Sequence, residues 1–337
     1  MKGLKKWTSA VSIGVLLNVS LTVSLTASLT ASCRMPRRQK SKVLTDLGAD
    51  NEAVAARFKR YKSKSSHCAP VPASQAEYRV ILAGFGPFSG VAFNTSSLVA
   101  MNFADLIDPA RGEFMLPALK PEDADGIVRQ DIVMIDGVRV AVCAVTASVI
   151  WDLAAAIYLH EAGVFRPDLM IMAGMDGGNA NVGTWEHHAT NVAAHLQGYE
   201  HDGSSSSVTP KIDDELSGDT IILPAGPDSL PMTWNSQNIT AMTRPIVRER
   251  FPGFDVRTSD EETPGKYLCN NVSYVVLAGL AGYELPLAGG KMNVKVNGLS
   301  ATKAGFFHYP WTSGQDKGAI ATWVKVMEAA IKSEMGR

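Results

Sequence analysis

The sequence predicts an α/β fold, in which a mixed, mostly parallel twisted sheet lies between two layers of helices in a three-layer αβα sandwich. Runs of consecutive apolar residues alternate along the chain with longer segments of helical periodicity. Strands that are apolar throughout are typical of sheets that helices cover on both faces. Glycine-rich and polar loops follow several of these runs, and open α/β folds place their functional sites at the carboxyl ends of strands.

Composition sets the size of the core and excludes one class of function. The chain has 337 residues, of which 46% are hydrophobic and 19% are charged, and this suits a globular protein with a large core. The formal net charge is −1, and no Arg/Lys stripe is interleaved with aromatic residues. We therefore expect no nucleic-acid partner.

The first 32 residues are typical of a secretory signal peptide. Lys2, Lys5 and Lys6 form a basic start, and an apolar stretch diluted by Ser and Thr follows from Trp7 to about Thr30. The stretch ends in LTAS before Cys33, which resembles the lipobox of bacterial lipoproteins, where the cysteine is acylated. We expect an exported protein of the bacterial envelope that contacts the membrane only through a lipid anchor at Cys33. Plain secretion, periplasmic or beyond, is the alternative, and the Ser and Thr content disfavours a retained transmembrane anchor.

Residues 33–76 are polar and rich in charge, and we interpret them as a tether that contains one short helix within 44–61. Cys68, near the end of this tether, could form a disulfide with Cys143 in an oxidising compartment. Cys143 lies in the apolar run RVAVCAVTA, however, so a free, buried cysteine is the favoured interpretation at that position.

The catalytic domain is expected to span residues 77–337. Its first half begins with a buried strand, YRVILAG, at 78–84, followed by a helix that Asn94 caps. A hairpin is expected at 131–145, turning at Asp136-Gly137. The segment 151–163 is a predicted helix that Gly163 ends. The expected elements that follow are a strand at 167–174, a surface loop at 198–220, a partial helix at 235–251, strands at 254–260 and 303–310, and an amphipathic helix at 314–334.

Cys269 is the leading candidate for a nucleophile. It lies in GKYLCNNVSYVVL, where a loop turns into an apolar helix, and the positive end of the helix dipole there favours the thiolate. A thiol nucleophile needs a base, and the predicted strand GFFHYP supplies His308. Glu186, in TWEHHATN, is the third polar group. Together they suggest a Cys-His-Glu hydrolase.

Four blocks of the sequence, in this order, resemble the pyroglutamyl peptidase I (pyrrolidone-carboxylate peptidase) family of cysteine peptidases. They are GFGPFSGVAFNTS at 84–96, GMDGGNANVGTWEHHATN at 174–191, PGKYLCNNVSY at 264–274 and AGFFHYP at 304–310. The resemblance covers the chain from about Tyr78 to its end. It implies a hydrolase, a thiol protease that removes an N-terminal pyroglutamyl or similar cyclic acyl group from a peptide through a thioester intermediate.

The resemblance also implies roles for individual residues. Cys269 matches the nucleophile, His308 the general base and acid, and Glu186 the group that orients the histidine. The substrate is a peptide with a blocked N-terminus, and neither a metal nor an organic cofactor is implied.

An apolar pocket with a few polar groups suits the uncharged lactam ring. Phe85 and Phe88 match the family's aromatic pocket residues, and Asn94 matches the residue that helps to hold the pocket loop. The two phenylalanines could instead be ordinary core residues. Asn94 is at least as easily explained as a helix cap.

Several positions depart from the family pattern and keep two alternatives open. Gly86 replaces an acidic residue, and Leu196 stands where the family has an arginine near its site. One alternative is an amidase whose substrate has drifted, and the other is a non-catalytic envelope lipoprotein that uses the scaffold for binding.

The histidines of the second block, His187, His188, His195 and His201, do not predict a metal site. They show neither HExxH nor CxxC spacing.

Overall fold

The computed structural model describes residues 49–64, 66–87, 93–108, 114, 125–176, 180–193, 220–259, 268–314 and 316–337, all within one compact unit of residues 40–337. The expected signal peptide, Cys33, Phe88 and most of the loop at 198–220 lie outside these residues. Within them, no helix combines the length and the apolar character that a membrane span needs.

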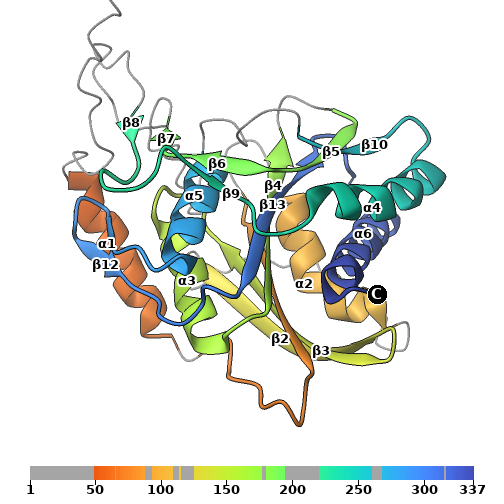
Figure 1. Ribbon diagram of the computed structural model, residues 1–337, viewed down its shortest axis with the longest axis horizontal. Coiled ribbons are helices and arrows are strands. Elements are labelled where there is room, and N and C mark those ends of the chain that lie inside the picture. The colour runs from red at the N-terminus through yellow and green to blue at the C-terminus, as the bar shows by residue number, and fades with distance from the viewer. Residues whose placement is uncertain are drawn as a thin grey trace, which may run out of the picture. The chain divides into compact units, whose positions relative to one another are not determined.

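A mixed, mostly parallel sheet of seven strands forms the centre of the unit (Figure 1). In order across the sheet, the strands are β10 (Asp255–Thr258), β5 (Val182–Trp185), β13 (Lys303–Pro310), β4 (Leu169–Asp176), β1 (Tyr78–Phe85), β3 (Val138–Ala147) and β2 (Gly126–Ile135). Only the pairs β5–β13 and β2–β3 are antiparallel. The α/β fold class is therefore confirmed.

Helices cover both faces of the sheet, as the apolar strands predict (Figure 1). On one face α2 (Thr95–Ile107), α4 (Ser236–Arg250) and α6 (Lys317–Met335) pack together. On the other face α5 (Leu268–Leu280) packs on α3 (Leu153–Phe165), which also contacts α1 (Ala49–Lys62).

Strand β13 shows why its segment is apolar on both sides. The rings of Phe307 and Tyr309 contact Trp323 of α6, with centroids 6.0 and 5.4 Å away. Phe306 and His308 alternate with them and point to the face that α5 covers.

Three two-stranded ladders complete the described secondary structure. They pair β6 (His188–Thr190) with β9 (Ser229–Pro231), β7 (Val192–Ala193) with β8 (Thr220–Ile221), and β11 (Leu285–Leu287) with β12 (Met292–Val294). The first two lie at the amino-terminal end of α5 (Figure 1), where they matter for the site.

The local turn chemistry gave one correct prediction and one wrong one. The hairpin of β2 and β3 turns at Asp136 and Gly137, whose φ angles of 46° and 79° are those of a type I′ turn. Helix α3, in contrast, does not end at Gly163 but runs to Phe165. A glycine alone does not stop a helix. The end comes at Arg166, which adopts the left-handed conformation and precedes Pro167.

The expected tether of residues 33–76 differs from the structure over its described part, because residues 49–76 pack on the domain. Tyr61 of α1 is fully buried, and Arg57 forms an ion pair with the buried Asp125 at 2.7 Å. These contacts fix α1 against the rest of the chain.

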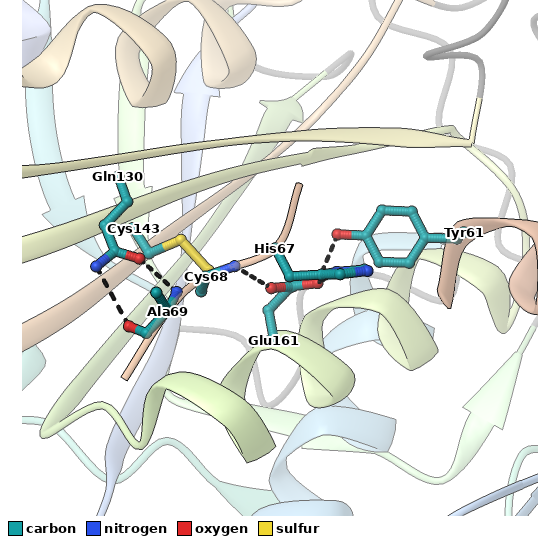
Figure 2. The surroundings of a disulfide bond; sticks show 7 residues. All are labelled: Tyr61, His67, Cys68, Ala69, Gln130, Cys143 and Glu161. Carbon is teal, nitrogen blue, oxygen red and sulfur yellow. Dashed lines mark hydrogen bonds and ion pairs between the residues drawn. A yellow bond between two sulfur atoms is a disulfide. The ribbon is translucent and has the colours of Figure 1, made fainter. Parts of the chain in front are cut away.

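The favoured interpretation of Cys143 as a free cysteine is wrong, because Cys143 forms a disulfide with Cys68 (Figure 2). The segment after His67 runs beside β2, where the side-chain amide of Gln130 accepts from the Ala69 N–H at 2.6 Å and donates to its carbonyl oxygen at 3.2 Å. This pairing brings Cys68 to Cys143, the partner of Gln130 across the β2–β3 ladder.

Candidate active site

Helix α5 presents Cys269 at its second residue. Every other residue of this 13-residue helix is buried, whereas Cys269 is partly exposed. Cys269 is also the free cysteine among the described residues. The first backbone N–H groups of a helix have no partner within the helix, so the thiol lies beside donors that favour negative charge.

Two buried asparagines hold the first turn of α5 in place. The side chain of Asn270 donates to the carbonyl oxygens of Thr190 and Val192 at 2.9 and 2.8 Å, and it accepts from the Thr190 N–H at 2.8 Å. Asn271 exchanges two hydrogen bonds of 3.3 Å with Asp152, the residue that precedes α3. The start of α5 is thus fixed to the short ladders on one side and to α3 on the other.

Asp152 itself sits in an unusual position. Its φ angle is 60°, and its carboxylate accepts from the Ala288 N–H at 2.8 Å. Burial raises the pKa of Asp152, while the hydrogen bonds from Ala288 and Asn271 oppose the rise. A left-handed aspartate costs free energy, so the contacts around it must hold it there.

His308 and Glu186 form a buried pair beneath α5. His308 lies on β13 with its Nδ1 atom 2.7 Å from Glu186 Oε1, and both side chains are more than nine-tenths buried. Glu186 follows the antiparallel neighbour β5, where its N–H donates to the Phe306 carbonyl oxygen at 3.0 Å. Its own carbonyl oxygen accepts from the indole N–H of Trp234 at 3.2 Å. The backbone of Glu186 is therefore held at both of its polar groups.

Cys269 is a second neighbour that acts on His308. Burial alone lowers the pKa of His308, but the charge and hydrogen bond of Cys269, together with those of Glu186, raise it well above its ordinary value. The imidazolium form is thus stabilised between a sulfur and a carboxylate. Glu186 and His308 are 122 residues apart in the sequence, and the fold brings their side chains into contact.

Gly174 on β4 has no side chain, and the thiol of Cys269 lies close to its backbone. It is the register partner of His308. A Cβ atom added there would lie 3.1 Å from Cys269 Sγ, 3.1 Å from Phe306 Cζ and 3.3 Å from Phe85 Cε2. Only glycine fits without displacing one of these groups.

Phe85 lies next to the same site, because its ring borders the space beside Gly174 that the thiol of Cys269 also borders. Phe85 is 3% exposed and packs on Phe306 and Tyr158, with ring centroids 6.5 and 6.3 Å away. Phe88, the other expected pocket residue, lies outside the described residues.

Asn94 is the N-cap of α2. Its Oδ1 atom accepts from the Ser96 N–H at 3.1 Å, and its Nδ2 atom donates to the Gly86 carbonyl oxygen at 3.4 Å. Gly84 allows the close approach of β1 to this helix, since a Cβ there would lie 2.6 Å from the Ser96 backbone. Asn94 thereby holds the loop after β1, beside the expected pocket.

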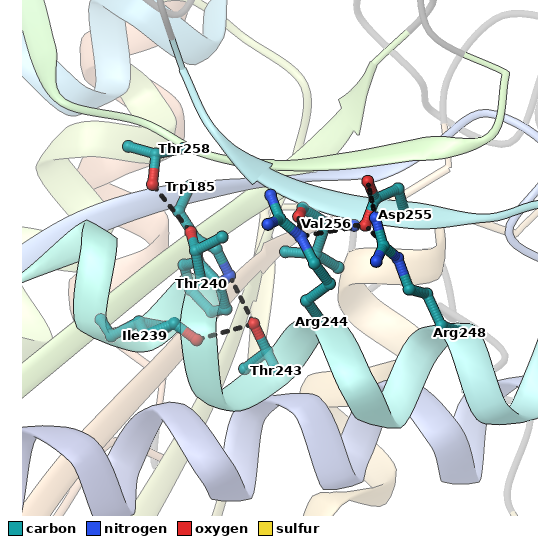
Figure 3. A network of polar contacts seen from close by, with 9 residues as sticks. All are labelled: Trp185, Ile239, Thr240, Thr243, Arg244, Arg248, Asp255, Val256 and Thr258. Atoms are coloured by element: carbon teal, nitrogen blue, oxygen red, sulfur yellow. Dashed lines mark hydrogen bonds and ion pairs between the residues drawn. The ribbon is translucent and has the colours of Figure 1, made fainter.

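A polar network supports the edge of the sheet that carries Glu186 (Figure 3). The Trp185 indole N–H donates to Thr243 Oγ1 of α4 at 3.1 Å. Two arginines of α4 fasten β10, with Arg244 donating to the Val256 carbonyl oxygen at 2.8 Å and Arg248 pairing with Asp255 at 2.9 Å. These contacts fix α4 to β10 and to β5, whose last residue, Trp185, directly precedes Glu186.

Comparison with known proteins points to one family. No family model matches the chain. The pyrrolidone-carboxylate peptidase of Thermococcus onnurineus is 27% identical over 263 residues, which cover 76% of this chain and 98% of that protein. The crystal structure of Bacillus amyloliquefaciens pyroglutamyl peptidase I superposes with a TM-score of 0.50 at 16% identity, covering 77% of this chain and 98% of that one, and it shows the shared fold. The chain is thus similar to pyroglutamyl peptidase I proteins in sequence and in fold.

The sequence did not predict the roles of three residues that support the site. Gly174 and Asn271 lie in the second and third blocks, which also contain assigned residues, so their positions were visible although their contacts were not. Tyr158 gave no signal, because a tyrosine on an apolar helix is ordinary. Its hydroxyl donates to the Gly84 carbonyl oxygen at 2.5 Å, and burial, followed by the charge of Cys269, raises its pKa.

Proposed function

We propose that this protein is a member of the pyroglutamyl peptidase I family and a cysteine exopeptidase that hydrolyses the amide bond after an N-terminal pyroglutamyl group. The relatives support a peptidase that acts on pyroglutamyl peptides. The observation that carries the proposal is the arrangement of His308, which lies 2.7 Å from Glu186 at Nδ1 and whose pKa is raised by the neighbouring Cys269 as well as by Glu186. Thiol, imidazole and carboxylate are thus in the order that nucleophilic catalysis requires.

The first half of the reaction forms a thioester. Glu186 holds Nδ1 of His308, which leaves Nε2 to accept the thiol proton of Cys269. The sulfur attacks the carbonyl carbon of the pyroglutamyl residue. His308 then returns the proton to the amide nitrogen, the carbon–nitrogen bond breaks, and the shortened peptide leaves with a free amine.

The second half releases the ring. Water gives a proton to His308 and attacks the thioester carbon, the carbon–sulfur bond breaks, and pyroglutamate leaves as the free acid. In both halves the negative charge on the carbonyl oxygen needs donors, and the N–H of Cys269 at the start of α5 is the first candidate. One such donor typically contributes about 10²–10³ in rate.

Substrate recognition is assigned to the end of β1. Phe85 borders the space over Gly174, so its ring can pack on the flat lactam. Asn94 holds the backbone at Gly86 and keeps this loop in position. Phe88 is proposed as the second aromatic wall, from its place in the first block.

Export with a lipid anchor at Cys33 is part of the proposal. The basic start, the apolar stretch and the small residues before Cys33 support it. The disulfide of Cys68 and Cys143 gives independent support, because such bonds persist in oxidising compartments and are rare in the cytosol.

The test is the turnover of a fluorogenic pyroglutamyl amide by the full-length chain, with the matching prolyl amide as a second substrate. A prolyl ring lacks the lactam oxygen and carries a charged amine, so a pyroglutamyl site should reject it. His308→Ala should lower kcat/KM by at least about 10³-fold, whereas His188→Ala, which removes a partly exposed histidine of β6, should not. Equal turnover of both amides, or full activity in His308→Ala, would exclude the proposed function.

A further inference from the structure

A second cluster of chemically capable side chains lies where the amino-terminal segment meets α3. His67 follows α1, and His160 and Glu161 are neighbours on α3. Each of the three offers one possible metal ligand atom, and these atoms all lie within 4.8 Å of one another. Figure 2 shows His67 and Glu161 beside Tyr61 and the disulfide.

Glu161 has the surroundings of a ligating carboxylate. It is fully buried. Its Oε1 atom accepts from the Tyr61 hydroxyl at 2.8 Å and contacts His67 Nδ1 at 2.6 Å, and its Oε2 atom accepts from the Cys68 N–H at 2.7 Å. Such outer hydrogen bonds orient carboxylates in metal sites.

The charge of Glu161 is poorly compensated by the protein alone. Its ion-pair partner is His67, which is charged only when protonated. Buried carboxylates are normally paired with a permanent cation or bound to a metal ion. A divalent cation would supply the missing positive charge at every pH at which it binds.

The imidazole nitrogens of the cluster have lone pairs to offer. The Nε2 atom of His67 is buried and has no hydrogen-bond partner among the described residues. His160 makes no hydrogen bond to another residue in the part of the chain that the structure describes. A buried nitrogen without a partner, such as Nε2 of His67, is uncommon in proteins and calls for an explanation.

We propose that His67, His160 and Glu161 form a site for one divalent transition-metal ion of the zinc class. Imidazole and carboxylate are ligands that Zn²⁺ accepts, and tetrahedral ligands about 2.0–2.1 Å from the ion lie about 3.4 Å apart. The three side chains must therefore close by up to about 1.4 Å. Rotation of the two histidines, neither of which is fully buried, provides this movement.

The ion would join His67, the residue directly before the disulfide-bonded Cys68, to helix α3. Bound metal therefore adds a second fastening of the amino-terminal segment to the domain. Because the ion binds the folded chain, it should raise the melting temperature.

The experiment measures Zn²⁺ binding by calorimetry on the full-length chain. The Cys269→Ala variant serves as the parent protein. It lacks the thiol that, together with His308, could otherwise bind Zn²⁺. We expect one equivalent of Zn²⁺, a visible absorption band of tetrahedral Co²⁺ when cobalt is the probe, and a rise in melting temperature of about 5 °C when Zn²⁺ is near 100-fold above Kd.

Two variants and a control decide the outcome. His160→Ala and His67→Ala should each weaken Zn²⁺ binding by at least about 10-fold and abolish the cobalt band, whereas His188→Ala should change neither. His160 makes no hydrogen bond to a described residue, so its variant should fold even if His67→Ala does not. The proposal is overturned if no binding is detected at about 1 mM Zn²⁺, a concentration at which even a weak site is half occupied. It is also overturned if His160→Ala binds Zn²⁺ as tightly as the parent protein.

Discussion

Replacing Gly174 by alanine gives a sharp test of how the thiol is placed. The added Cβ atom would lie 3.1 Å from Cys269 Sγ and from Phe306 Cζ, and 3.3 Å from Phe85 Cε2. Phe306 is fully buried and Phe85 nearly so, and neither ring has space to retreat. Cys269 is partly exposed, so the sulfur is the group that moves, by a few tenths of an ångström.

The size of the effect follows from that displacement. A misplacement of 1 Å can cost about 10²-fold in rate, so a shift of roughly half that distance should lower kcat/KM for a pyroglutamyl amide by about 10-fold. Overpacking of the buried neighbours should also lower the free energy of unfolding by about 1–3 kcal/mol. Kinetics and urea denaturation measure the two effects separately.

Gly163→Ala is the matched control. This added Cβ meets Val296 Cγ1 at 3.2 Å, a similarly tight contact that involves none of the proposed catalytic groups. Its activity should equal that of the parent. A Gly174→Ala protein that folds and hydrolyses the amide at the parental rate would refute the placement of the thiol over Gly174.

Three further changes test other parts of the structure. The double variant Cys68→Ala and Cys143→Ala opens a link between residues 75 apart, and chain entropy alone predicts a loss of up to about 4.5 kcal/mol in urea denaturation; a change below about 1 kcal/mol would contradict this. Glu186→Gln removes one cause of the raised pKa of His308, so the alkaline limb of kcat/KM, where the imidazolium is lost, should move to lower pH, and an unmoved limb would argue against the pair. Asn271→Ala removes both hydrogen bonds between Asn271 and the buried Asp152, which should lower the free energy of unfolding by about 1–3 kcal/mol and slow the alkylation of Cys269. An unchanged free energy of unfolding would show that these two hydrogen bonds do not hold the start of α5.

The strands were the most predictable part of the fold, because their apolar runs are buried on both faces. The segments at 78–84 and 303–310 correspond closely to β1 and β13. The hairpin turn was readable from Asp136-Gly137, since few residue pairs accept two positive φ angles. The α3 boundary was not, because a glycine within a helix weakens it without ending it.

The role of residues 49–76 could not be read from local patterns. Their exposed positions carry a mixture of charged, polar and small residues, as in a tether, and only a few side chains such as Phe58 and Tyr61 anchor them in the core. The pairing of Cys68 with Cys143 depends on where two distant segments meet. Nothing in the apolar run around Cys143 distinguishes a bonded cysteine from a free one.

The candidate site was predictable where chemistry constrains residue type. A thiol at a helix start, a histidine late in a strand and a carboxylate were each visible as Cys269, His308 and Glu186, and the structure brings these three side chains together. Supporting residues such as Asn271 are polar side chains whose partners come from other elements. Their function exists only in the tertiary structure.

The central claim is that the sulfur of Cys269 performs the reaction, and its direct test is partial alkylation with iodoacetamide. Samples taken over time are assayed for turnover of a pyroglutamyl amide, and peptide mapping measures the fraction of Cys269 that is modified. Loss of activity should follow modification of Cys269 one to one, and free pyroglutamate should slow both. A protein whose Cys269 is fully alkylated and which still cleaves the amide would contradict the account.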